Sequence, residues 1–126
     1  MADDQLITFK EMCARFDVTP RTLRYYEYIE LLSPHKEGRS RFYGAREIAR
    51  MTLILRGRRW GFSLEDIRQW LLLYDKQGTL EQFRVLIDLA DQQLVNLEEQ
   101  IADLVAARDD LQAMRESTAE QLKQMV

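Results

Sequence analysis

The chain has 126 residues, of which 46% are hydrophobic and 31% charged, which fits a helix-rich soluble protein with one ordinary domain or a small domain and one long element. Its apolar runs are far too short to cross a bilayer and its single cysteine excludes an internal disulfide framework, so we expect a cytoplasmic protein with no membrane partner. The net charge of −3 is uneven: residues 1–74 hold thirteen basic and ten acidic side chains, residues 75–126 five and eleven, and a basic face on the first part remains able to bind phosphate.

Two short helices joined by a tight turn are predicted near the N-terminus. The run Thr8–Glu11 is a capping box followed by apolar residues at helical spacing, which predicts a helix over residues 8–16. After the turn, Thr19 and Pro20 suit the N-cap and the first position of a second helix, which we expect to end near Leu31. This arrangement is typical of a helix-turn-helix.

The second helix is predicted to carry a nucleic-acid-binding face. Leu23 and Tyr26 stand three residues apart and can face inward together, which leaves four polar neighbours facing outward. Arginine binds phosphates and the guanine edge, and hydroxyl groups bind phosphates. An ordinary solvated helix start is the alternative. The four outward residues are Arg21, Thr22, Arg24 and Tyr25.

Residues 34–43 do not fit a helical period. Glu37 and Gly38 suit a turn between two short extended runs, so we predict a small β-hairpin wing with cationic tips. A solvated loop is the alternative. The basic residues of this wing are Lys36, Arg39 and Arg41, and Phe42 and Tyr43 close it.

A second helix pair is predicted after the wing. The helical period returns at Gly44, and the helix ends in a basic run whose Arg58 and Arg59 suit both the helix dipole and a phosphate. Ser63 begins a further capping box, which opens a helix to about Tyr74.

The last part of the chain is predicted to be one long dimerisation helix. No Gly or Pro interrupts residues 79–126, which would span roughly 70 Å as a helix. Its apolar residues alternate at spacings of three and four, as in a coiled coil, and residues 1–75 cannot cover so long a stripe. We therefore predict a homodimer, with residues 76–126 as the dimerisation part. The predicted seam is Leu80, Phe83, Ile87, Ala90, Leu94, Leu97, Ile101 and Leu104.

The seam pattern shifts after Leu104, so a helical hairpin folded within the chain at residues 105–110 is the alternative to pairing. Neither enzyme chemistry nor a bound cofactor is expected. The single histidine, His35, has no metal-ligating neighbour in sequence, and Cys13 fits the buried side of the first helix. No nucleophile, base or metal site is evident.

Five features of the sequence occur in a characteristic order: Thr22–Glu27, Leu31–Pro34, Gly38 with Arg41 and Tyr43, Trp60–Leu64, and Ile67. In this order they resemble the MerR family of bacterial transcription regulators, and the resemblance covers residues 7–74. Residues 53–59 and 73–75 also resemble its LiuR-like branch, which is linked to the breakdown of branched-chain amino acids and acyl-CoA.

The resemblance implies a mostly α-helical fold, with a winged helix-turn-helix DNA-binding domain over residues 1–75 followed by an antiparallel coiled coil. It implies a homodimer on a palindromic operator in an overlong promoter spacer, which it bends and untwists so that RNA polymerase engages both promoter elements. Any small organic or acyl-CoA effector would bind between the coiled coil and the DNA-binding domain of the opposite subunit. The implied DNA contacts are Arg21, Thr22, Arg24 and Tyr25 at the major groove, Arg39, Arg41 and Tyr43 on the wing, and Arg58 and Arg59 at phosphates.

Two departures from the family pattern are visible. Glu30 stands where the family usually has glycine, which implies a strained left-handed backbone or a different turn. The long helix lacks the cysteines of the metal- and redox-sensing branches, so such sensing is not expected. A coiled-coil module whose helix-turn-helix docks a protein is the alternative function.

Overall fold

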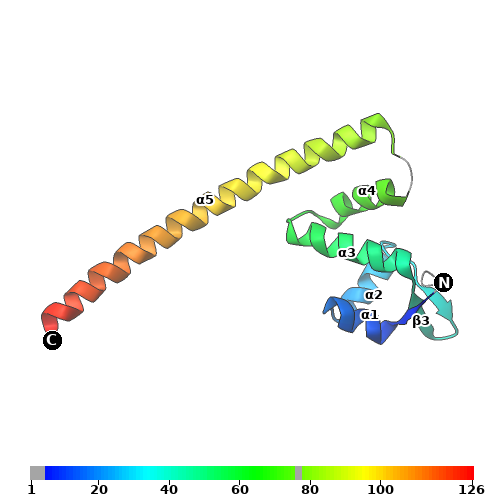
Figure 1. The fold of residues 1–126 in the computed structure, drawn as a ribbon, viewed down its shortest axis with the longest axis horizontal. Helices are drawn as coiled ribbons and strands as arrows, with labels where there is room; N and C mark the ends of the chain where they lie inside the picture. The colour runs from blue at the N-terminus through cyan, green and yellow to red at the C-terminus, as the bar shows by residue number, and fades with distance from the viewer. Residues whose placement is uncertain (1–4, 76–77) are drawn as a thin grey trace. The chain divides into compact units, whose positions relative to one another are not determined.

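The computed structural model describes residues 5–75 and 78–126, without the side chains of residues 74 and 75, so the predicted domain boundary between residues 75 and 76 lies partly outside the described residues. The chain divides into two compact units, Met1–Leu86 and Ile87–Val126. The boundary between the units therefore lies inside the last helix, beyond the end of the predicted DNA-binding domain. The first unit contains all the strands and helices that precede this last helix (Figure 1).

The first helices begin where the sequence predicts. Strand β1 (Ile7–Thr8) leads into α1 (Phe9–Phe16), and α2 (Pro20–Tyr28) follows. Thr8 and Glu11 form the predicted capping box: the Thr8 hydroxyl accepts the Glu11 N–H at 3.1 Å, and the Glu11 carboxylate accepts the Thr8 N–H at 3.0 Å. Thr19 likewise caps α2 by accepting the Thr22 N–H at 3.1 Å. These local hydrogen bonds fix both N-termini.

Helix α2 ends at Tyr28, earlier than expected, because the chain reverses at a left-handed residue. Glu30 has a φ of 65°. Its N–H bonds the Glu27 carbonyl at 3.0 Å, and the Leu31 N–H bonds the Tyr26 carbonyl at 2.9 Å. This is the Schellman arrangement, in which the left-handed position usually belongs to glycine. For Glu30 the sequence allowed either a strained left-handed backbone or a different turn, and the structure has the strained backbone.

The wing is a three-stranded antiparallel sheet with the strand order β1-β3-β2. Strands β2 (His35–Glu37) and β3 (Ser40–Tyr43) form the predicted hairpin. Gly38 has a φ of 60° in the two-residue loop, as the first position of a type II′ turn requires. Strand β1 was not predicted, because two residues carry no alternation to recognise.

Helices α3 (Ala45–Arg59) and α4 (Leu64–Asp75) form the second predicted pair. They pack closely at Gly57, where an added Cβ would lie 2.7 Å from the Ile67 Cγ1 atom. Ser63 caps α4 by accepting the Asp66 N–H at 3.1 Å. The largest fully buried side chains of the core are Met12, Leu23, Leu31, Tyr43, Met51, Ile54, Ile67 and Leu71.

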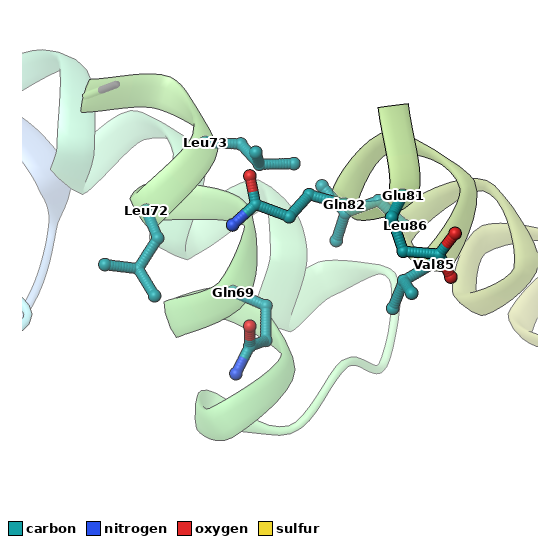
Figure 2. Close-up of a pocket in the computed structure, with 7 residues that line it drawn as sticks. All are labelled: Gln69, Leu72, Leu73, Glu81, Gln82, Val85 and Leu86. Atoms are coloured by element: carbon teal, nitrogen blue, oxygen red, sulfur yellow. The ribbon is translucent and has the colours of Figure 1, made fainter. Parts of the chain in front are cut away.

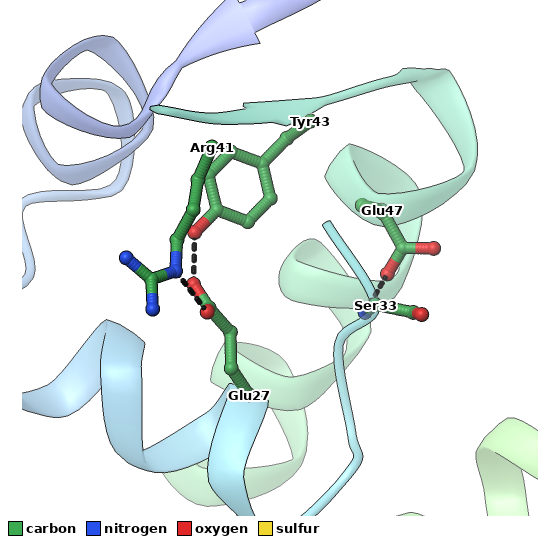
Figure 3. A network of polar contacts seen from close by, with 5 residues as sticks. All are labelled: Glu27, Ser33, Arg41, Tyr43 and Glu47. Carbon is green, nitrogen blue, oxygen red and sulfur yellow. Dashed lines mark hydrogen bonds and ion pairs between the residues drawn. The ribbon is translucent and has the colours of Figure 1, made fainter. Parts of the chain in front are cut away.

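Charged side chains of α3 hold the segment that connects α2 to the wing. The buried Arg50 donates its Nε–H to the Leu31 carbonyl at 2.9 Å. The buried Glu47 accepts the Ser33 N–H at 2.9 Å (Figure 3). These contacts give hydrogen-bond partners to backbone groups of the segment that follows α2, and they tie that segment to α3.

Helix α5 runs without interruption over Leu80–Met125, which is 46 residues or about 69 Å. The Thr79 hydroxyl accepts the Gln82 N–H at 3.1 Å, and the Gln82 side chain accepts the Thr79 N–H at 2.8 Å, and together these bonds form a capping box. The alternative hairpin at residues 105–110 is wrong, because the helix continues through them. Among the described residues, no helix has the length and apolar content to span a membrane.

Candidate nucleic-acid interface

The outward face of α2 is arranged as the helical spacing predicts. Leu23 and Tyr26 are buried. Arg21 and Arg24 are exposed and Tyr25 is half-exposed. Both guanidinium groups and the Tyr25 phenol are therefore available to a partner.

A shallow groove of about 560 Å³ follows this face of α2. Arg58 of α3 lines it, so the structure brings one of the two basic residues predicted on that helix beside Arg21 and Arg24 of α2. Tyr28, which is 83% exposed, was not predicted as a site residue. Its only signal in the sequence is its place three residues after Tyr25 on the same helix. The complete lining is Arg21, Thr22, Arg24, Tyr25, Tyr26, Tyr28, Arg58 and Leu64.

A second hollow, of about 290 Å³, lies where α1, α2 and the wing meet. Arg24 lines this hollow as well as the groove, so the two form one surface. The guanidinium group of Arg24 lies over the Phe9 ring at 5.6 Å, which supports it from below. Lys10 adds a cation that the sequence did not single out. The hollow is lined by Thr8, Phe9, Lys10, Arg24, Arg39, Ser40, Arg41 and Phe42.

Tyr43 does not present its side chain on this surface, contrary to the expectation from the sequence. It is fully buried, and its hydroxyl donates to a carboxylate oxygen of Glu27. Arg41 donates its Nε–H to the other oxygen of Glu27 at 2.8 Å (Figure 3). Burial, and then the Glu27 carboxylate, raise the pKa of Tyr43 well above its usual range. Tyr43 therefore joins the wing to α2.

Comparison with known proteins identifies the family of this chain. Residues 7–73 match the model described as "MerR HTH family regulatory protein", and residues 48–114 match "MerR, DNA binding". The transcriptional regulator HmrR of Rhizobium leguminosarum is 34% identical over 104 residues, which cover 81% of this chain and 78% of the relative. The chain belongs to the MerR family. It is a helix-turn-helix transcription regulator.

Solved structures of MerR-family regulators share the fold. A regulator from Bacillus cereus superposes with a TM-score of 0.63 at 28% identity, covering 84% of this chain and 79% of that one. The regulator HiNmlR, solved bound to promoter DNA, superposes with a TM-score of 0.67 at 20% identity, covering 83% and 80%. At that identity the second likeness concerns the fold alone.

The remaining predicted DNA contacts of this MerR-family chain lie at the edges of the surface. Lys36 is exposed on β2 and pairs in register with Arg41 on β3. Arg59 is exposed at the end of α3 but lines neither hollow. The structure thus gathers Arg21, Thr22, Arg24, Tyr25, Arg39, Arg41 and Arg58 around two adjoining hollows, and leaves Lys36 and Arg59 outside them.

Helix α5 carries the predicted dimerisation seam on its surface. Ala90 and Leu97 are half-buried in the single chain. An apolar stripe of this length is rarely left to water. The other members of the seam are exposed, namely Leu80, Phe83, Ile87, Leu94, Ile101 and Leu104.

Cys13 is half-buried on α1. Burial, and then the nearby Glu27 carboxylate, raise the pKa of its thiol. The thiolate is the form that attacks or binds metal, so this environment disfavours both uses of Cys13. Among the described residues, no three His, Cys, Asp or Glu side chains group as a metal site requires.

Proposed function

We propose that this chain binds a palindromic promoter operator as a homodimer and distorts the promoter DNA to control transcription. The observation that carries the proposal is the joined surface on which Arg24 lines both the groove of α2 and the hollow beneath the wing. A helix in the major groove flanked by cations at the phosphates is the arrangement of a helix-turn-helix reader. In this proposal Arg21 and Arg24 lie in or beside the major groove, where they contact base edges or the neighbouring phosphates, and Arg58 contacts a phosphate.

The dimer part of the proposal rests on α5. Its exposed seam repeats at spacings of three and four, so a second copy in antiparallel orientation covers both stripes at once. A two-fold dimer presents two identical DNA-binding domains, so the operator must be palindromic. The distance between the two domains then sets the spacing of its half-sites.

The promoter-distorting part rests on the family and on charge. HiNmlR, a MerR-family regulator with this fold, was solved on promoter DNA. Bending a site by 40–90° costs of order 1–6 kcal/mol, which contacts to phosphates must offset. The cations of both hollows supply such contacts in this chain. RNA polymerase, in the cytoplasm, would be the partner that reads the distorted promoter.

A candidate pocket for a small organic effector lies in the first unit. It is a hollow of about 160 Å³ at α4 and the first turns of α5, lined by apolar side chains such as Leu72 and Leu86, and the Gln82 side chain extends from α5 toward α4 (Figure 2). Pockets for drug-sized ligands measure about 300–1,000 Å³, so this one suits a short acyl or branched aliphatic group and not the nucleotide of an acyl-CoA. Its lining is Gln69, Leu72, Leu73, Glu81, Gln82, Val85 and Leu86.

Genome-wide binding of the tagged protein tests the proposal first. We expect enrichment at promoters that share a palindrome within an unusually long spacer. Footprinting in vitro should then protect both half-sites, with DNase-hypersensitive positions at the centre where the duplex is distorted. Binding should weaken steeply with salt, because each phosphate contact releases counterions. A palindrome outside the spacer would indicate simple repression. No enrichment at any site would favour the protein-docking alternative.

A further inference from the structure

Glu27 is an acidic side chain of α2, the helix that we propose enters the major groove. A carboxylate there would ordinarily repel phosphate. Its side chain is only 10% exposed, however, and both of its oxygens are occupied by groups of the wing. Arg41 holds one oxygen and Tyr43 the other, from alternate positions of β3 that share a face of the strand.

The contact with Glu27 orients the guanidinium group of Arg41. Only the Nε–H of Arg41 is bonded to the carboxylate, at 2.8 Å, and the two terminal nitrogens point away from Glu27 and Tyr43 (Figure 3). A guanidinium group carries five N–H donors in a rigid fork. Fixing its Nε–H therefore fixes the direction of the other four.

The hollow beside the wing carries the cations that a phosphate group would require. Arg41 is 32% exposed and lines this hollow together with Lys10, Arg24 and Arg39. Among the described residues, no carboxylate forms an ion pair with those three cations. Hydroxyl groups of Thr8 and Ser40 add hydrogen-bonding partners.

We propose that Glu27 is a positioning residue for DNA binding, which turns Arg41 so that its terminal N–H groups bind one backbone phosphate in the hollow lined by Lys10, Arg24 and Arg39. The inference rests on the proposed function. It assigns a specific role to an acidic residue on a DNA-facing helix. The Tyr43 hydroxyl keeps the Glu27 carboxylate in place, so a buried residue of the wing helps to orient the partly exposed Arg41.

Simple electrostatics predicts the opposite sign. If Glu27 only repelled phosphate, Glu27→Gln would bind the operator more tightly, because one negative charge near the duplex is removed. If Glu27 positions Arg41, the same change weakens specific binding, because a neutral amide with one oxygen replaces a carboxylate that bonds Arg41 through one oxygen and Tyr43 through the other. The direction of the change in Kd therefore separates the two accounts.

The experiment measures Kd of full-length parent and variants for a duplex spanning the palindrome mapped by genome-wide binding, at several salt concentrations. We expect Glu27→Gln to weaken binding about tenfold and to lower the slope of log K against log salt by about 1, as loss of one phosphate contact does. Arg41→Lys keeps the charge but removes the fork, and it should have the same effect. The double variant should bind no more weakly than either single one.

Tyr43→Phe is the matched control, because it changes no charge and removes one of the two contacts to Glu27. It should weaken binding by less than Glu27→Gln. Thermal unfolding of each variant separates loss of fold from loss of binding, and Tyr43→Phe with Arg41→Lys decides the matter if Glu27→Gln does not fold. Parental or tighter binding by folded Glu27→Gln, or additive effects in the double variant, would overturn the inference alone. Failure of the parent to bind the duplex would overturn the proposed function too.

Discussion

Replacing Glu30 with glycine is expected to stabilise the fold, because residue 30 is held in a left-handed conformation. At its φ of 65°, an L side chain crowds the following carbonyl oxygen, at a cost of roughly 1–2 kcal/mol. Glycine removes that cost but loses more chain entropy on folding, by roughly 0.5–1 kcal/mol relative to alanine. The free energy of unfolding should therefore rise by about 0.5–1 kcal/mol.

Urea unfolding followed by circular dichroism measures this change. The protomer concentration is held fixed, because association contributes to the apparent stability of a dimer. Glu30→Ala is the matched control: it removes the same carboxylate but keeps the Cβ atom that causes the strain. In a unit of this size the expected gain corresponds to a Tm higher by about 3–6 °C. Equal stability of the alanine and glycine variants would refute the strain argument.

DNA binding by the same two variants separates charge from strain. Glu30 is exposed at the end of α2, close to the proposed duplex. Removing its carboxylate should strengthen operator binding modestly and equally in both variants, since electrostatics depends on the charge and not on the backbone. A gain in affinity confined to the glycine variant would mean that the turn itself limits how α2 meets DNA.

Four further changes test other parts of the structure. Arg24→Ala should weaken operator binding more than tenfold in mobility-shift assays while the dimer stays intact, because charged hydrogen bonds contribute about 1.5–3 kcal/mol each. Leu94→Glu combined with Leu97→Glu should yield a monomer by light scattering. Gly57→Val should lower the free energy of urea unfolding by about 1–3 kcal/mol, because a Cβ there lies 2.7 Å from a side-chain carbon of α4. Burial and a bonded carboxylate raise the pKa of Tyr43, so its contribution to stability is complete below pH about 10 and declines progressively above it, where the difference in free energy of unfolding between parent and Tyr43→Phe should shrink.

Each change has an outcome that would contradict it. Arg15→Ala removes an exposed cation of α1 that lines neither hollow, and an Arg24→Ala variant that binds no worse than this control would have no role at the duplex. Val95→Glu adds charge to α5 beside the seam and should remain dimeric; if it dissociates as the seam variant does, the seam is misplaced. If Gly57→Val unfolds at the same urea concentration as the parent, then α3 and α4 make room for the larger side chain without a loss of stability. If the difference in free energy of unfolding between the parent and Tyr43→Phe does not change with pH, then ionisation of the Tyr43 hydroxyl does not contribute to stability.

The starts of the helices were predictable from sequence, whereas the end of α2 was not. A cap such as Thr19 needs only the hydrogen bond to an N–H three residues on, which the sequence alone specifies. The end of α2 depends on Glu30 adopting a conformation that its own side chain disfavours. The contacts of Arg50 and Glu47 with the following segment come from α3, 19 and 14 residues away. No local pattern reports such contacts.

The candidate site shows the same division between local and distant contacts. Helical spacing was enough to place Arg21, Arg24 and Tyr25 on one face of α2. Tyr43 was expected among the wing contacts, but its hydroxyl bonds Glu27, 16 residues earlier in the chain. Lys10 joins the wing hollow only because β1 pairs with β3, and two residues of strand are too few to predict.

The contacts around the end of α2 matter because a protein that bends a DNA duplex must keep its own DNA-binding elements fixed against the elastic force of the bent DNA. The elastic cost of the bend, of order 1–6 kcal/mol, is borne by the residues that hold phosphates. In this chain the residues proposed to hold phosphates lie on elements that charged groups join: Glu27 links α2 to the wing, and Arg50 and Glu47 link the following segment to α3. Breaking a buried ion pair leaves an unpaired charge, which is costly. The reading helix and the wing are therefore expected to move together on DNA, and a duplex that cannot bend to meet both should lose one set of contacts entirely.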